Sequence, residues 1–342
     1  MLARGVHMSS FHRRNTLFLI AISAISTWVS GLDLGSRQNT SQIPGWPTKT
    51  VRLIVGFPGG SSPDLTARTL AEPLSKALGQ PVIVENKVGA GGNIGADYVA
   101  KATDNHTLGL MINGNMTTAK LLNPKLSYDP LKDLQPVTLV GVSPLVLMAP
   151  LHAPGATAAE FMKAAKAAGD SWSYGSPGVG TVGHIGMELL KARTGIQAVH
   201  VPFPGYAQVA GGMVGGLLQL SMLPPAQAIA QVKGGKLRAI GVTSSGRSSL
   251  APDYPSMSEA GVPNFNLEIW NAVAAPKNLP APIVAKLAKL ISEISRTPEV
   301  RQKLFQQGWQ VVGTSPEGLA NRIQSDTALY GDVIKKLGVS NE

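Results

Sequence analysis

The sequence predicts an α/β protein of two lobes, and three observations support this expectation. Short apolar runs with strand character alternate with helical stretches over most of the chain, which is typical of α/β folds. The 342 residues exceed what one hydrophobic core usually serves, so two domains are expected. Two glycine-rich loops, far apart in the chain, each follow a predicted strand and open a predicted helix.

The N-terminus predicts an export signal over residues 1–30. Basic residues precede an apolar run at 16–25, and small residues follow near Ser30. The run is too short for a typical membrane span, so a cleaved signal peptide is favoured over an uncleaved anchor. Residues 31–46 are polar and turn-rich, and they predict a flexible lead into the fold.

Charge and cysteine content exclude several kinds of site. The net charge is +10, and it falls to +7 without Arg4, Arg13 and Arg14 of the predicted signal. The other basic residues are scattered over predicted helices and are not interleaved with aromatic residues, which favours a solvated surface over a nucleic-acid site. The chain has no cysteine, so disulfides, thiolate metal sites and thiol nucleophiles are excluded.

The folded part is expected to begin at Trp46, after which strands and helices follow in a regular order. Most strand candidates are short apolar runs without alternation, as in strands that are buried on both faces of a parallel sheet. These strands are expected at 51–57, 82–85, 107–112, 137–140, 145–149, 171–174, 198–201, 218–222, 237–242 and 268–274. Helices are expected at 65–78, 94–102, 158–168, 182–193, 207–214, 226–232, 282–294, 298–307 and 316–337.

The end of the chain predicts a discontinuous first lobe. Three helices and few strands follow residue 268, so this tail is expected to pack back on the first lobe. The strands at 145–149 and 268–274, each ended by a proline, are the expected crossings between lobes. We therefore expect lobe 1 to comprise 47–147 and 268–342, and lobe 2 to comprise 148–267.

The two glycine-rich loops predict an anion site. Neither loop carries a lysine or an arginine. A helix start offers unpaired backbone N–H groups and roughly half a positive charge, so it can hold an anion without a cationic side chain. Two such starts suggest that a carboxylate is held from two sides. The candidate residues are Phe57, Pro58, Gly59, Gly60, Ser61, Ser62 and Asp64 in the first loop, and Ser176, Gly178, Gly180, Thr181 and His184 in the second.

The residues of these loops also allow other interpretations. Residues 178–183 match G-x-G-x-x-G, but the next strand does not end in the acidic residue that a dinucleotide site uses for the ribose. Asp64 could be a general base, but capping the following helix is favoured because Asp is a preferred N-cap. His184 could orient a ligand or bond the neighbouring backbone, and the sequence leaves both open. No histidines outside the signal have helical metal-ligand spacing.

Several motifs resemble one family, the extracytoplasmic receptors of tripartite tricarboxylate transporters, also called Bug receptors. The resemblance covers residues 46–325 and rests on WPTKTVRLIVGFPGGSSPDLTAR, VIVENKVGAGGNIGADYVAKA, SYGSPGVGTVGHIGMELLK, HVPFPGYAQ, KGGKLRAIGVTSSGRS and APDYPSMSEAGVPNF. It implies a type II periplasmic-binding-protein fold, in which two lobes with mostly parallel sheets are joined by two crossing strands. It also implies that the ligand sits on the two loops already described. Asn113, Pro204, Gly205 and Tyr206 complete the expected set of ligand-binding residues.

The resemblance implies a periplasmic receptor that captures a small carboxylate and delivers it to transporter membrane subunits. It implies no catalysis, cofactor or metal, and we expect a monomer that binds no nucleic acid. Two alternatives stay open: a sensor that presents ligand to a membrane signalling protein, and an enzyme with Asp64 and His184 as acid and base. The chain departs from the family where acidic residues are usual, at Gln219 and near Leu223. If these positions face the cleft, amino-acid ligands are less expected than plain carboxylates.

Overall fold

The computed structural model describes residues 45–338, so the predicted signal and residues 31–44 of the predicted lead lie outside the described residues. The described residues form one compact unit. Trp46, at the start of the described part, is buried, and its indole nitrogen donates a hydrogen bond to the carbonyl of Asn105. No helix within residues 45–338 is long and apolar enough to cross a membrane.

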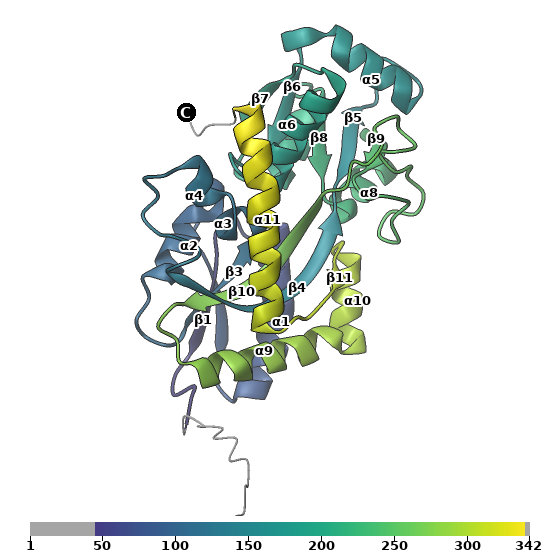
Figure 1. The fold of residues 1–342 in the computed structure, drawn as a ribbon. Coiled ribbons are helices and arrows are strands. Elements are labelled where there is room, and N and C mark those ends of the chain that lie inside the picture. Colours follow the sequence, from purple (N-terminus) through teal and green to yellow (C-terminus); the bar gives the residue numbers. More distant parts are fainter. Residues whose placement is uncertain (1–44, 339–342) are drawn as a thin grey trace, which may run out of the picture. The chain divides into compact units, whose positions relative to one another are not determined.

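Lobe 1 is built on a six-stranded mixed sheet with the order β11-β4-β10-β3-β1-β2 (Figure 1). β1, β2, β3 and β4 run in one direction, and β10 and β11 run in the other. The strands are β1 (Val51–Val55), β2 (Val82–Asn86), β3 (Thr107–Ile112), β4 (Leu134–Pro144), β10 (Glu268–Pro276) and β11 (Gln310–Val311).

Lobe 2 is built on a five-stranded mixed sheet with the order β7-β6-β8-β5-β9. Its only antiparallel member is β5, which lies between β8 and β9. The strands are β5 (Val146–Pro150), β6 (Ser173–Ser176), β7 (Val199–Pro202), β8 (Leu220–Leu223) and β9 (Leu237–Val242). The predicted α/β fold of two lobes, each with its own sheet, is confirmed. In both sheets most strands run in one direction.

Helices cover both sheets. Lobe 1 carries α1 (Ser62–Leu78), α2 (Asn93–Ala100), α3 (Asn113–Met116), α4 (Ala119–Leu122), α9 (Ala281–Arg296), α10 (Pro298–Gln306) and α11 (Pro316–Leu337), with a short 3₁₀ turn, η1 (Ala90–Gly92), before α2. Lobe 2 carries α5 (Ala158–Ala167), η2 (Gly169–Ser171), α6 (Val182–Thr194), α7 (Tyr206–Val214) and α8 (Pro225–Lys233).

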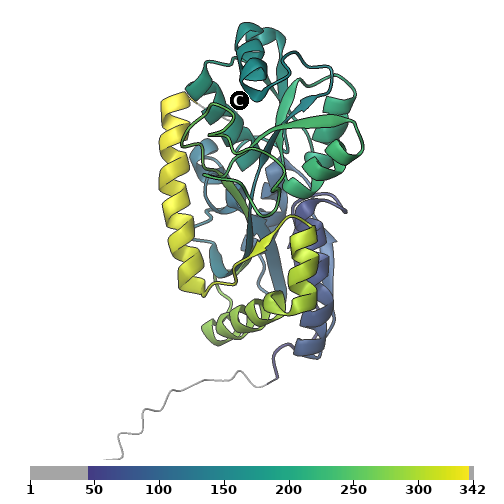
Figure 2. The same cartoon turned by 90° about the vertical axis from the view of Figure 1, so that its right-hand side faces the viewer.

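The last helix, α11, reaches both lobes. It packs against β4 of lobe 1 and also contacts α6 of lobe 2, as Figure 1 shows. Figure 2 places α11 on one face of lobe 1, and α1 with α10 on the opposite face. The tail of the chain therefore returns to lobe 1, as the sequence predicts.

The two sheets are joined where the chain passes from β4 to β5 and from β9 back to β10. Thr243, which is fully buried, links the two passages. Its amide donates to the carbonyl of Leu145, its hydroxyl accepts from the Leu145 amide at 2.8 Å, and the same hydroxyl donates to the carbonyl of Leu267 at 2.7 Å. These bonds hold the crossing segments side by side.

Three local features differ from the expected elements. α1 begins at Ser62, before the expected residue 65, because Pro63 fits the first helical turn. β4 begins at Leu134, before the expected 137, although it contains Pro136. Pro136 pairs with Ala274 of β10 next to a register shift between Val273 and Ala274, and proline is tolerated at such irregularities of a sheet. The short helices α3 and α4 and the two-residue β11 were not predicted at all.

Candidate ligand-binding site

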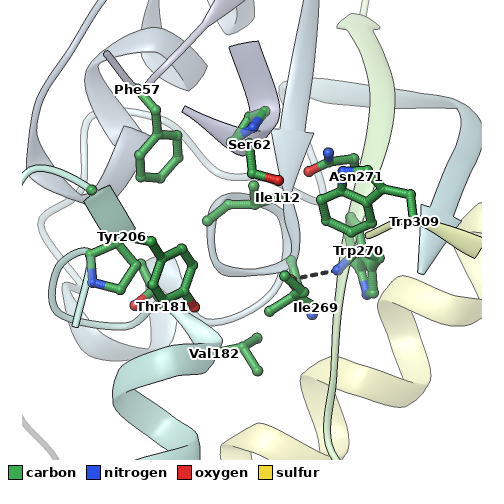
Figure 3. Close-up of a pocket in the computed structure, with 14 residues that line it drawn as sticks. Phe57, Ser62, Ile112, Thr181, Val182, Tyr206, Ile269, Trp270, Asn271 and Trp309 are labelled. Atoms are coloured by element: carbon green, nitrogen blue, oxygen red, sulfur yellow. Dashed lines mark hydrogen bonds between the residues drawn. The ribbon is translucent and has the colours of Figure 1, made fainter. Parts of the chain in front are cut away.

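A partly open cavity lies between residues of the two lobes (Figure 3). It has about 40 Å³ of space open to the centre of a water molecule. Its lining comes from the start of α1, the end of β3, the start of α6, the start of α7, β10 and the residue before β11. The lining residues are Phe57, Ser62, Pro63, Ile112, Asn113, Pro177, Thr181, Val182, Gly205, Tyr206, Ile269, Trp270, Asn271 and Trp309.

The first glycine loop brings the start of α1 to the cavity. Ser61 is the N-cap residue of this 17-residue helix, but its hydroxyl makes no capping bond. Gly60 has a φ of +77°, a left-handed conformation that glycine adopts without strain. The turn at Gly60 directs Ser62 and Pro63, the first residues of α1, to the cavity wall.

Asp64 holds this loop in place and does not line the cavity. Its buried carboxylate accepts hydrogen bonds from the Gly60 amide at 2.8 Å, the Arg68 guanidinium at 2.9 Å and the Asn86 amide at 2.9 Å. Burial by itself would raise the pKa of Asp64, but the bonds from Arg68, Asn86 and Gly60 outweigh it and keep the pKa below its usual range. Asp64 therefore ties down the loop, whereas its predicted placement as N-cap is wrong because α1 begins at Ser62 and Ser61 is its N-cap.

The second glycine loop brings the start of α6 to the opposite side of the cavity. Thr181 is the N-cap residue of this 13-residue helix, and its hydroxyl donates to the carbonyl of Gly178 at 2.7 Å. The amide of Gly180 donates to Nδ1 of His184 at 3.1 Å. Of the two roles that the sequence left open for His184, the structure shows the bond to neighbouring backbone.

Behind this loop, His184 and His200 stack with ring centroids 4.1 Å apart, and Tyr174 stacks on His200. Nε2 of His200 lies 2.7 Å from the hydroxyl of Ser176. Burial lowers the pKa of His184 to about 4, opposed by Glu188 and assisted by Lys191. Burial, His184 and Lys191 lower the pKa of His200 to about 3. Both rings are therefore neutral at neutral pH.

Asn113 and β10 form a third side of the cavity. Nδ2 of Asn113 donates to the carbonyl of Glu268 at 2.9 Å, and its Oδ1 accepts from the amide of Trp270 at 3.2 Å. The indole nitrogen of Trp270 in turn donates to Asp326 at 2.7 Å. The side chain of Asn113 thus positions β10 at the cavity.

The structure brings six of the sequence-predicted residues together at this cavity: Phe57, Ser62, Asn113, Thr181, Gly205 and Tyr206. Gly178 and Pro204 line a second hollow of about 500 Å³, which shares Phe57 and Pro177 with the first. The other predicted residues, Pro58, Gly59, Gly60, Ser61, Asp64, Ser176, Gly180 and His184, belong to the two loops but do not line the cavity. Ligand contact by these residues stays a prediction.

Sequence reasoning missed the wall formed by Ile269, Asn271 and Trp309, and it misplaced Gln219 and Leu223. Gln219 accepts a hydrogen bond from the Ser173 amide and donates to the carbonyl of Gly216. Leu223 is fully buried in the core of lobe 2. Neither lines the cavity, so the argument that missing acids at these positions shape the ligand site was wrong.

The electrostatics of the cavity come from backbone dipoles. Its lining contains no Asp, Glu, Lys, Arg or His among residues 45–338. Helices α1 and α6 both begin at its wall, and each helix start carries a partial positive charge. The arrangement suits a small anion held by backbone N–H groups and hydroxyls.

Comparison with known proteins agrees with this geometry. Residues 66–339 match the family model described as tripartite tricarboxylate transporter family receptor. This chain belongs to that family. The receptor is 32% identical to protein BugT of Bordetella pertussis over 295 residues, which cover 86% of this chain and 90% of BugT. As a member of a solute-binding family, the receptor is not an enzyme.

Solved structures show the same two-lobed fold. Rpa4515 of Rhodopseudomonas palustris, solved with adipate, is 29% identical with a TM-score of 0.82, covering 86% of this chain and 99% of the other. MatC of the same organism, solved with bound malate, is 32% identical with a TM-score of 0.79, covering 84% and 100%. Both relatives were therefore seen with a small dicarboxylate.

Proposed function

We propose that this receptor captures a small organic carboxylate in the cavity between its lobes. The observation that carries the proposal is the meeting of two helix starts, α1 from lobe 1 and α6 from lobe 2, at one cavity whose described lining holds no charged side chain. A carboxylate there receives backbone N–H groups from both lobes, so binding it favours the closed arrangement. The adipate and malate seen with two relatives support this ligand class.

We further propose that the receptor is exported to the periplasm as a monomer and delivers its ligand to the membrane subunits of a tripartite tricarboxylate-type transporter. The family match supports this role. In this proposal lobe 1 comprises residues 47–147 and 268–342, and lobe 2 comprises 148–267. The crossing bonds of Thr243 lie close to both proposed boundaries and would serve as the hinge.

A thermal-shift screen of the purified receptor tests ligand capture. The ligands are mono-, di- and tricarboxylates, aromatic acids and acidic amino acids. A bound acid at 100 times its dissociation constant adds about 2.7 kcal/mol to the free energy of unfolding, which a melting curve resolves. If no carboxylate raises the melting temperature, the proposed function is wrong.

A deletion strain tests delivery. Deleting the gene should abolish uptake of the acid that the screen identifies, and restoring it should recover uptake. Unchanged uptake in the deletion strain would leave capture intact and overturn delivery. N-terminal sequencing of the exported protein should find a start between Ser30 and Trp46, whereas an intact Met1 or Met8 on cytoplasmic protein would contradict export.

A further inference from the structure

Three buried polar atoms border one part of the cavity and have no hydrogen-bond partner among residues 45–338. They are Oγ of Ser62, Oδ1 of Asn271 and Nε1 of Trp309. Figure 3 shows the side chains of these residues at the same end of the cavity. Asn271 is fully buried and Trp309 is 3% exposed. Buried polar groups in folded proteins are nearly always paired, so these three atoms are the strongest candidates for side-chain contacts with a ligand.

The direction of the Asn271 amide is set by a relay through Thr66. Nδ2 of Asn271 donates to the hydroxyl of Thr66 at 3.0 Å, and that hydroxyl donates to the carbonyl of Ser62 at 3.1 Å. A hydroxyl has one proton. Because Thr66 uses its proton on the Ser62 carbonyl, it can only accept from Asn271, and the NH₂ group must face Thr66. The amide oxygen of Asn271 is therefore the free group on the cavity side.

These three atoms differ in what they can bond. Nε1 of Trp309 only donates, the hydroxyl of Ser62 donates or accepts, and Oδ1 of Asn271 only accepts. An ionised carboxylate is acceptor-only, so it can pair with Trp309 and Ser62 but not with the Asn271 oxygen. The Asn271 oxygen needs a ligand group that carries a hydrogen.

A hydroxyl or an ammonium group could supply that hydrogen. The two differ in charge, and therefore in the cost of burying them in the cavity. An ammonium buried without a carboxylate partner carries a large desolvation penalty. No acid among the described residues lines the cavity. Asp64, in the neighbouring loop, is already bound by Gly60, Arg68 and Asn86. A neutral hydroxyl meets the Asn271 oxygen without this penalty.

We propose that Asn271 is a specificity-determining residue that selects carboxylates bearing a hydroxyl group over the unsubstituted acid and over the amino acid. This inference rests on the proposed function, because it assumes that the cavity holds a carboxylate. It names hydroxy acids as the ligand class and assigns the hydroxyl contact to Asn271, which the relay through Thr66 positions.

Calorimetry with matched ligands tests the inference. The two series are succinate, malate and aspartate, and glutarate, 2-hydroxyglutarate and glutamate. In the series that fits the cavity, the hydroxy acid should bind at least tenfold more tightly than either of the others. If the unsubstituted acid or the amino acid binds as tightly, the inference is overturned while carboxylate capture stands. If no acid in either series or in the wider screen binds, both fail together.

Two variants test whether Asn271 causes the preference for the hydroxy acid over the unsubstituted acid. In Asn271→Leu the hydroxy acid should lose at least tenfold in affinity and the unsubstituted acid much less, so their ratio falls to within about threefold. Thr66→Val breaks the relay without changing Asn271, and it should lower the same ratio. Thr138→Val is the matched control, because Thr138 is equally buried and donates to the carbonyl of Thr314 in lobe 1 away from the cavity. If the affinity ratio of hydroxy acid to unsubstituted acid is unchanged in both Asn271→Leu and Thr66→Val, the assignment of the hydroxyl contact to Asn271 is overturned. If Asn271→Leu does not fold, Thr66→Val alone decides the assignment.

Discussion

The hydroxyl of Thr118 in lobe 1 donates a 2.7 Å hydrogen bond to the carbonyl of Gly180 in the second glycine loop. The loop that borders the cavity from lobe 2 is thus held by its own lobe, through His184, and by the opposite lobe, through Thr118. Backbone packing adds to this contact, since a Cβ on Gly114 would lie 3.0 Å from the same carbonyl. Contact between the lobes therefore depends on the conformation of one short loop, and the proposed ligand capture would depend on it as well.

The backbone at Gly180 gives the first prediction. Its φ is +79°, and a Cβ there would lie 2.6 Å from Cδ1 of Leu122 in lobe 1. Gly180→Val should therefore weaken carboxylate binding by at least tenfold, because left-handed strain of about 1–3 kcal/mol and the clash both oppose the closed loop. Calorimetry measures the loss.

Gly60 and Gly211 serve as comparisons for this variant. A Cβ on Gly60 would meet no atom within 4 Å, but the residue has a φ of +77°, so Gly60→Val should weaken binding mainly through backbone strain. Gly211→Ala, in helix α7, has open space and no left-handed φ, so it should leave binding unchanged and raise stability slightly. Normal binding by both valine variants would place the ligand elsewhere.

Asp64 gives the second prediction. Asp64→Leu should destabilise the receptor by about 1–3 kcal/mol, because it leaves the Gly60 amide without its acceptor and removes one of the two acceptors of the Asn86 side chain. Asp64→Asn keeps one acceptor oxygen and should lose less stability and affinity. Chemical denaturation and calorimetry measure both quantities. Equal losses in the two variants would show that the negative charge, and not the acceptor geometry, holds the loop.

The histidine pair gives the third prediction. An unfolded histidine titrates near pH 6.5, whereas the pKa values of His184 and His200 in the fold are lowered to about 4 and about 3. Between these values the unfolded chain binds more protons, so stability is full above about pH 6.5 and falls as the pH drops toward 4. Protonation of His184 at Nδ1 would also break the bond from Gly180, so affinity should fall as the pH approaches the folded His184 pKa of about 4.

Urea denaturation and calorimetry between pH 7.5 and 4 check this prediction. His200→Gln should flatten the pH dependence of stability, because one of the two depressed groups is gone. His152→Gln is the control, because His152 is exposed in lobe 2 and outside the stack. A slope that is the same in wild type and His200→Gln would assign the pH dependence to other groups.

The contrast between Ser62 and Asn271 shows how far the sequence predicts the site. The strand–glycine loop–helix pattern is local, so it predicts that Ser62 and Thr181 belong to loops that open helices, and the structure places both at the cavity. Asn271 and Trp309 carry no local signal. Asn271 lies in an apolar strand, and its role depends on a hydrogen bond to Thr66, 205 residues away in the chain. The same limit applies to Asn113 at the start of α3, whose side chain bonds to β10, more than 150 residues away in the chain.

The contact between Thr118 and Gly180 gives the last prediction. Thr118→Val keeps the shape of the side chain but removes the hydrogen bond between the lobes, leaving the buried Gly180 carbonyl without that donor. A bond of this kind contributes about 0.5–1.5 kcal/mol, so affinity should fall by about twofold to tenfold, mainly through faster ligand release from a less stable closed state. Thr117→Val is the matched control, because Thr117 is also buried but donates to the carbonyl of Asn113 within lobe 1. Stopped-flow release and calorimetry measure both variants. If Thr118→Val releases ligand no faster than Thr117→Val, this hydrogen bond does not stabilise the ligand-bound closed state.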